Sequence, residues 1–235
     1  MIKARPLTGL SAIALALLFN VPFAILGSTF DYPDVLRRPA GAVLDLFAAG
    51  GNMLILTWHA FGLTALLLAP VAIMLALTPE RVSARPVLAV GAAILGALAG
   101  LAQAIGLWRW VFVIPGLAHT HASPASNPEA RLAAERAFDV LNQYGGVAIG
   151  EHLGQWLTAL FVLFLGLAQW GEGRRISALI GFATAAAVAV GTEEGVAIAL
   201  GQSGAIFSMA TIAGFLGLTL WLIVSGIGEL RGKKS

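Results

Sequence analysis

Long apolar stretches separated by short polar segments dominate the chain. A helix that crosses the hydrocarbon core of a membrane needs about 20 mostly apolar residues. Six stretches reach that length: about 7–30, 52–77, 86–116, 145–170, 176–200 and 204–228. The pattern therefore predicts an all-α protein, a polytopic membrane helical bundle of about six transmembrane helices that forms a single domain over residues 1–235.

The fifth stretch contains a polar interruption, Gly191-Thr192-Glu193-Glu194-Gly195. If this were a loop, the helix would be limited to 176–190, which is too short to span. We therefore expect the helix to run to Leu200, with a break at the glycines as an alternative, and we place the turn at 201–204. If the helix ends early instead, Glu193 and Glu194 are solvated loop residues.

Two outer connections are longer than simple turns. Pro39 is typical of a helix start, and Gly50-Gly51 ends the apolar stretch that follows it, which predicts a short interfacial helix over about 39–49. Asn127-Pro128 is typical of a helix N-cap followed by proline at the first helical position. It predicts a second outer helix over about 128–142.

Composition supports a membrane protein and excludes several kinds of site. Hydrophobic residues make up 58% and charged residues only 11% of the chain, whereas soluble domains have about 25% charged residues. Cysteine is absent, which excludes disulfides, thiolate nucleophiles and iron–sulfur clusters. The net charge is only +2 and the basic residues are scattered near the ends of apolar runs, so we expect the bilayer and no nucleic acid as a partner.

The basic residues also predict the orientation. Lys and Arg concentrate in cytoplasmic loops. An orientation with both ends inside places nine basic residues inside and five outside. The nine are Lys3, Arg5, Arg81, Arg85, Arg174, Arg175, Arg231, Lys233 and Lys234. We therefore predict an N-in, C-in bundle whose first apolar stretch is an uncleaved membrane helix.

Ionisable side chains from four predicted spans lie at one depth. Each is about seven residues from the outer end of its span, or roughly 10 Å below the outer surface at 1.5 Å per residue. They are His59, Arg109, Glu151, His152, Glu193 and Glu194, and Gln155 shares a helix face with Glu151. Because a charge in hydrocarbon costs about 2.5–3.5 kcal/mol on insertion scales, we expect these groups to face the bundle interior and meet.

Specific contacts follow from this expectation. Arg109 needs an anion, which Glu151, Glu193 or Glu194 could supply. Gly145, Gly150 and Gly154 leave room for a close helix contact beside Glu151. We expect the inner half of the bundle to be almost free of charge, with Gln103 as the only inward extension of the polar layer.

The leading functional hypothesis is a small-ligand or ion-binding membrane protein, either a transporter or a sensor. Its ligand would arrive from the outer side and bind at Glu151, His59, His152 and Arg109, and protonation of Glu151 or His152 would accompany binding. The sequence has no inverted repeat and no long inward polar path, so a homo-oligomer would have to complete a transport path.

Two other hypotheses remain open. In the first, the protein is a membrane enzyme with a metal ion held by His59, Glu151 and His152, or with haem b between His59 and His152 and Arg109 at the propionates. In the second, it is a structural or partner subunit of a membrane complex, and the polar layer is an ion-pair network that fixes helix register.

Other polar and aromatic residues are expected to have surface or packing roles. We expect His119 and His121 to be exposed in the outer connection, and Arg37 and Arg38 to meet lipid headgroups. The tryptophans near the polar layer are expected to form an interfacial belt or to pack, with the wall of a pocket as an alternative. They are Trp58, Trp108, Trp110 and Trp156.

Two short segments resemble a known family. They are Phe30-Asp31-Tyr32-Pro33-Asp34-Val35-Leu36 and Gly150-Glu151-His152-Leu153-Gly154-Gln155. Together with the helix layout they resemble a family of bacterial integral-membrane proteins known as domain of unknown function 4386. The resemblance implies a helical bundle in the bacterial cytoplasmic (inner) membrane, so that the outer side would be periplasmic. It implies no activity, cofactor or site residue.

Overall fold

The computed structural model describes residues 4–231, and residues 1–3 and 232–235 are not described. Lys3, Lys233 and Lys234, which contribute to the predicted orientation, lie outside the described residues. Residues 4–231 contain helices and no β-strand. Six helical stretches are long and apolar enough to cross a membrane, which confirms the predicted fold class. They are Pro6–Thr29, Ala40–Ala76, Pro86–Ala122, Pro128–Gly171, Arg175–Ala199 and Ala205–Arg231.

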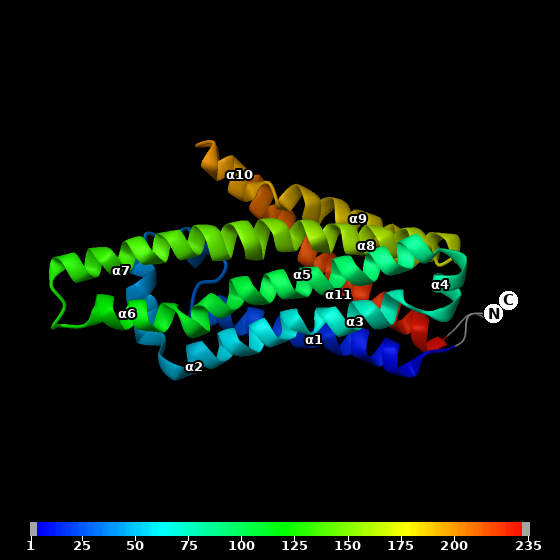
Figure 1. Cartoon of the computed structure of the whole chain (residues 1–235), viewed down its shortest axis with the longest axis horizontal. Coiled ribbons are helices and arrows are strands. Elements are labelled where there is room, and N and C mark those ends of the chain that lie inside the picture. The colour runs from blue at the N-terminus through cyan, green and yellow to red at the C-terminus, as the bar shows by residue number, and fades with distance from the viewer. Residues whose placement is uncertain (1–3, 232–235) are drawn as a thin grey trace.

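Most of the helices run roughly parallel to the long axis of the molecule, whereas α11 (Ala205–Arg231) crosses it obliquely (Figure 1). The bundle consists of α1 (Pro6–Thr29), α2 (Ala40–Leu66), α3 (Leu68–Ala76), α5 (Pro86–Phe112), α8 (Gly154–Gly171), α9 (Arg175–Gly191) and α11. The described chain begins and ends at one end of the bundle, next to the short α4 (Pro79–Ala84). We call this the inner end, following the predicted orientation, and the opposite end the outer end.

Kinks divide two of the long helices near the outer end. Gly51 has φ +61, a conformation that suits glycine, and the chain turns there within α2. The helix expected over about 39–49 is the first part of α2, before this kink. A second kink lies at Val113, between α5 and α6 (Ile114–Ala122), so the third span is straight only to Phe112.

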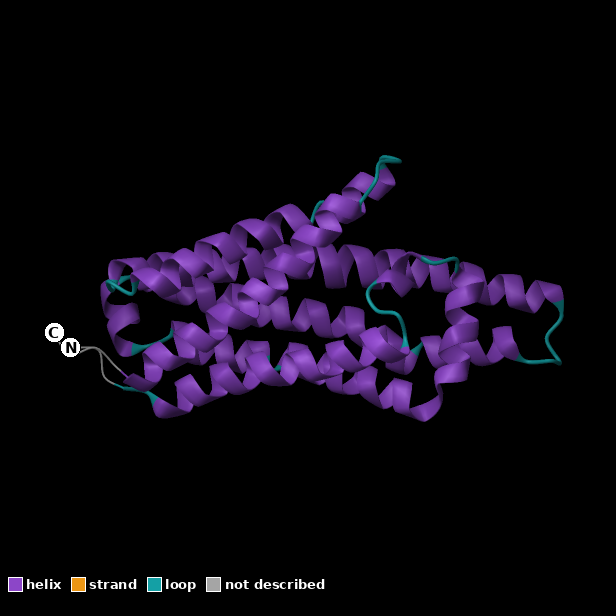
Figure 2. Ribbon diagram, turned by 180° about the vertical axis from the view of Figure 1, so that it is seen from behind, coloured by secondary structure: helices purple, strands orange, loops and turns teal. Residues whose placement is uncertain are grey.

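The fourth span is part of a much longer helix. A run of 44 residues comprises α7 (Pro128–Leu141), the π-helical segment η2 (Asn142–Leu153) and α8. A break expected between about 142 and 145 is absent. At 1.5 Å per residue the run is about 66 Å long, against about 30 Å for a bilayer core. The α6–α7 hairpin therefore projects beyond the bundle, at the end opposite the termini (Figure 2).

The fifth span is not continuous. α9 ends at Gly191, and α10 (Glu194–Ala199) begins after Thr192 and Glu193 and diverges from the bundle (Figure 1). The expected fifth span is therefore present as Arg175–Ala199, with the break at the glycines that was the alternative. The return towards α11 uses Gly201, whose φ is +73.

The core has two parts. The inner part is aliphatic and built largely from alanine, leucine and valine, with Trp221. The outer part is aromatic, and Trp58 and Trp110 are fully buried in it, with their rings stacked 4.9 Å apart. These two tryptophans are therefore core residues and not belt residues.

Candidate functional site

A cavity of about 140 Å³ lies in the outer half of the bundle. Its walls come from α1, α2, α5, η2, α8 and α11, and the segment between α1 and α2 contributes Tyr32, Pro33 and Leu36. Most of the lining is aromatic or aliphatic. Of the predicted site residues, Arg109, Glu151 and Gln155 line this cavity, as does Gln103.

Arg109 on α5 is buried beside the cavity and bonded to neutral groups. Its Nη2 donates to Oδ1 of Asn142 over 2.9 Å, its Nη1 donates to the carbonyl of Gly106, and its Cζ lies 5.1 Å from the ring centroid of Trp110. Its Nε has no hydrogen-bond partner among residues 4–231. No carboxylate of the described chain forms an ion pair with Arg109. The expected pairing with Glu151, Glu193 or Glu194 is therefore wrong.

Glycines make room for Arg109 where α5 crosses η2. A Cβ on Gly106 would lie 2.6 Å from Cα of Gly150, so the two backbones touch. A Cβ on Gly146 would lie 2.6 Å from Cζ of Arg109. The predicted close helix contact at Gly150 is therefore present, and η2 offers the guanidinium a surface without side chains.

Glu151 pairs with a residue that the sequence did not single out. Nη2 of Arg37, at the end of η1 (Asp34–Arg37), lies 2.7 Å from Oε2 of Glu151, and Nε of Arg37 lies 3.0 Å from Oε1 of Glu194. Burial lowers the pKa of Arg37, but the two carboxylates together raise it by more, so the pKa lies above its ordinary value. Arg37 thus stays charged and joins η1, η2 and α10. The neighbouring Arg38 pairs with the exposed Asp31.

Tyr32 adds a neutral hydroxyl to the cavity wall. Burial is the main reason why the pKa of Tyr32 lies above its ordinary value, and the negative charge of Glu151 raises it further. The phenol therefore remains protonated and able to donate a hydrogen bond. Its ring packs edge-on against Trp58, with centroids 5.3 Å apart.

The predicted histidines and Glu193 do not line the cavity. His59 packs against Trp108 with ring centroids 6.1 Å apart, and its Nδ1 has no partner in the described chain. Nδ1 of His152 donates to the carbonyl of Thr192 over 2.9 Å. Glu193 accepts a 3.2 Å hydrogen bond from the Thr192 hydroxyl. The break after α9 thus leaves Glu193 and Glu194 partly buried and bonded, not in a solvated loop.

These positions do not fit the suggested cofactors. Within residues 4–231, no group of three or more His, Cys, Asp or Glu side chains is placed to hold a metal ion, so His59, Glu151 and His152 do not form a ligand set. The rings of His59 and His152 have separate surroundings, Trp108 and the Thr192 carbonyl, and neither lines the cavity. The pair therefore does not suit the two axial positions of haem b.

The outer hairpin contains a second polar contact. His121 is buried, contrary to expectation, while His119 is exposed as expected. Nδ1 of His121 lies 2.8 Å from Oδ1 of Asp45, and its Nε2 lies 2.9 Å from Oε1 of Glu135. The imidazole therefore ties α6 to the first part of α2 and to α7.

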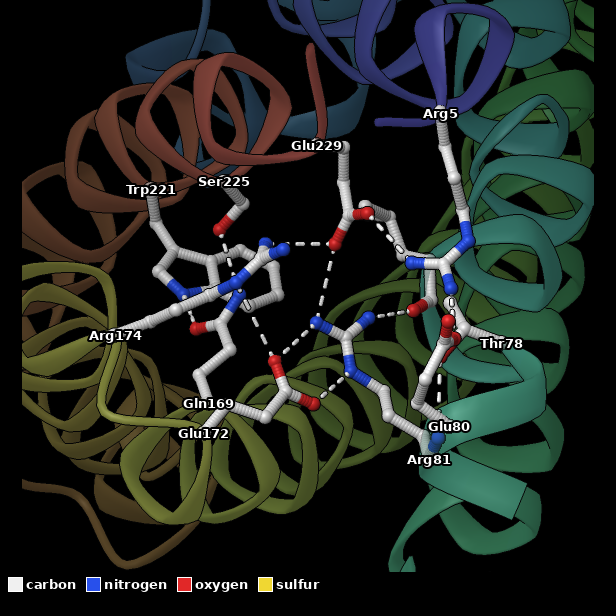
Figure 3. A network of polar contacts seen from close by, with 11 residues as sticks. Arg5, Thr78, Glu80, Arg81, Gln169, Glu172, Arg174, Trp221, Ser225 and Glu229 are labelled. Carbon is white, nitrogen blue, oxygen red and sulfur yellow. Dashed lines mark hydrogen bonds and ion pairs between the residues drawn. The ribbon is translucent and has the colours of Figure 1, made fainter. Parts of the chain in front are cut away.

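A larger ion-pair network closes the inner end, where the sequence suggested scattered charges (Figure 3). Glu229 of α11 is at its centre, with Oε atoms 3.1 Å from Arg5, 3.1 Å from Arg81 and 2.8 Å from Arg174. Glu172 accepts two further hydrogen bonds from Arg81, over 2.6 and 2.9 Å. Burial lowers the pKa of Arg81, but Glu172 and Glu229 raise it above its ordinary value. The network is built from residues that the predicted orientation assigns to the cytoplasmic ends of the spans.

The two segments that carry the family resemblance meet at the cavity. Tyr32, Pro33 and Leu36 of the first segment line it, and so do Gly150, Glu151 and Gln155 of the second. Arg37, which directly follows the first segment, bonds Glu151 of the second.

Comparisons with known proteins agree with this resemblance. No curated protein and no solved structure matches the chain. One family model matches residues 7–226, which is nearly the whole chain and includes every residue that lines the cavity. The protein therefore belongs to the family described as domain of unknown function DUF4386.

Proposed function

We propose that this protein is a membrane-embedded binding protein that holds a small, mainly apolar ligand in the outer cavity. One observation carries the proposal. Of the buried N–H groups that have no hydrogen-bond partner among residues 4–231, three belong to cavity-lining residues: Nε of Arg109, Nε1 of Trp58 and Nε1 of Trp110. An unpaired buried donor costs about 1–3 kcal/mol, so acceptor oxygens on a ligand would compensate these three groups.

The size and walls of the cavity support a small ligand. An engineered apolar cavity of about 150 Å³ stays dry and binds benzene, and this cavity has about 140 Å³. Phe19, Phe23, Phe61 and Phe215 contribute aromatic walls. A ring-sized apolar group with one or two acceptors matches this combination of walls and donors.

Binding is better supported than transport through the bundle. The inner end is closed by buried ion pairs, since Glu229 is fully buried and Arg81 is 2% exposed. Gln103, the expected start of an inward path, donates to the Thr158 hydroxyl over 2.9 Å. We therefore favour a sensor or carrier with one binding site in the outer half of the bundle.

The test uses a heavy-atom quencher of tryptophan fluorescence. We expect 4-bromoacetophenone, which has one ring and one acceptor, to quench the nanodisc-embedded protein saturably. Trp110→Phe removes a donor and a fluorophore from the cavity and should reduce this component. Trp170→Phe is the matched control, because Trp170 packs against Phe182 and Arg175 outside the cavity.

One quenching result would contradict the proposal. Quenching that rises linearly with the amount of probe, and to the same extent in both variants, would show partition into lipid without a site. That outcome would overturn the proposed function.

A further inference from the structure

We infer that the ligand is a neutral, bilayer-soluble carbonyl compound of aryl-ketone or quinone type, which enters sideways between α1 and α11. This inference rests on the proposed function and specifies its ligand class and route. It replaces the expected arrival of a ligand or ion from the aqueous outer side.

The charges around the cavity favour a neutral ligand. Glu151 is bonded to Arg37, which also holds Glu194, and Arg109 interacts with Glu151 through space. These two cations and two anions sum to zero. A bound carboxylate would leave one excess negative charge in a buried site, and a bound cation one excess positive charge, and each costs several kcal/mol.

The hydrogen-bonding groups favour carbonyl oxygens. The unpaired groups of Arg109, Trp58 and Trp110 are all donors, and the Tyr32 hydroxyl on the cavity wall is protonated. A carbonyl oxygen accepts hydrogen bonds and carries no proton that would need an acceptor. A hydroxyl or amine ligand would bring donors into a site that already has an excess of them.

Both ends of the cavity are covered. Towards the outer side, Tyr32, Pro33 and Leu36 lie over it, and the adjoining Arg37 is fixed to η2 and α10 by its two ion pairs. Towards the inner side, Asn20 donates to the Thr219 hydroxyl over 3.0 Å. Below that bond α1 and α11 touch, since a Cβ on Gly9 would lie 2.6 Å from the carbonyl oxygen of Gly226.

The side between α1 and α11 is open. Ile212 and Leu216 line the cavity, yet they are 41% and 61% exposed. Both residues lie in the apolar stretch Ala205–Arg231, so their exposed surface faces hydrocarbon. α11 crosses the bundle obliquely and separates from α1 towards its α10 end (Figure 1). A molecule dissolved in the bilayer can therefore reach the cavity without crossing water.

Two matched probes test the ligand class. 4-Bromoacetophenone and 4-bromobenzoate share the ring and the bromine but differ in charge. Saturable quenching in nanodiscs should give binding at least about tenfold weaker for the benzoate, because it adds an uncompensated charge. Equal or tighter binding of the benzoate would overturn the inference and leave the proposed function standing. Saturable binding of neither probe would overturn both.

A pair of α11 variants tests the route. Leu216→Trp places a bulky ring at the gap, whereas Leu220→Trp places it one turn further in, at an exposed residue that does not line the cavity. We expect the association rate of 4-bromoacetophenone, measured by stopped-flow quenching, to fall several-fold in Leu216→Trp and to stay unchanged in Leu220→Trp. Equal rates in both variants and in the unsubstituted protein would overturn the lateral route.

Discussion

The inner ion-pair network allows a quantitative prediction for Glu229→Gln. Glu229 lies in a cluster of three cations, Arg5, Arg81 and Arg174, whose other carboxylates are Glu80 and Glu172. Counted over the described residues, these three arginines and three glutamates balance, and the substitution leaves one buried positive charge without its counterion.

The structure sets the size of the effect. Glu229 accepts charge-assisted hydrogen bonds from all three arginines, and its side chain is 1% exposed. Breaking a buried ion pair by removing one partner costs about 3–5 kcal/mol. Because glutamine keeps one acceptor oxygen in place, we expect a loss near the lower figure, ~3 kcal/mol. For a chain of this size that corresponds to a fall in Tm of about 6–12 °C.

The assay is thermal unfolding of the purified protein in detergent, followed by circular dichroism and by the fraction that remains monodisperse. Asp31→Asn is the control, since Asp31 pairs with Arg38 and both side chains are 47% exposed. That pair should contribute less than about 1 kcal/mol. If Glu229→Gln unfolds within 2 °C of Asp31→Asn, the network adds no net stability and the reasoning fails.

Two further predictions concern packing and the outer hairpin. Gly106→Ala places a Cβ 2.6 Å from the backbone of Gly150, so we expect the free energy of unfolding to fall by about 1–3 kcal/mol in the same thermal unfolding assay. Gly116→Ala is the control, because a Cβ there has nothing within 4 Å, and it should be neutral. Equal Tm values for the two variants would refute the close crossing. His121→Leu removes the imidazole that bonds Asp45 of α2 and Glu135 of α7, so limited proteolysis should cut the loop at 123–127 faster than in the unsubstituted protein. His119→Leu is the control, because it alters an exposed histidine. Equal cleavage of the two variants would show that His121 does not hold the hairpin to α2.

The helical spans could be predicted from the sequence, but not their interruptions. Hydropathy and length identify a membrane helix because lipid requires long apolar runs. The kink at Val113 and the π-helical continuation through Asn142 depend on packing between helices, which apolar composition does not encode. The kink at Gly51 did have a signal in the sequence, the Gly50-Gly51 pair that was predicted to end the first outer helix.

The sequence could predict the level of the candidate site residues along the bundle, but not which way their side chains point. The rise per residue places His59, Arg109 and Glu151 in one layer. Which way each side chain points depends on how its helix is rotated against its neighbours, and His59 turns towards Trp108 while Arg109 and Glu151 line the cavity. Arg37 was missed because it lies in a connection between spans, where no helical period relates it to Glu151.

The contact between α1 and α11 has a consequence for biosynthesis. Arg5 and Glu229 are 224 positions apart, yet they bond directly. At about 5–20 residues per second, a ribosome needs on the order of 10–45 s to make the last helix after the first. For that interval the nascent chain lacks the partner of its first helix, one wall of the cavity and the central acid of the inner network. A chain that terminates before codon 205 would never acquire α11, so this truncated fragment should become a substrate for membrane proteases.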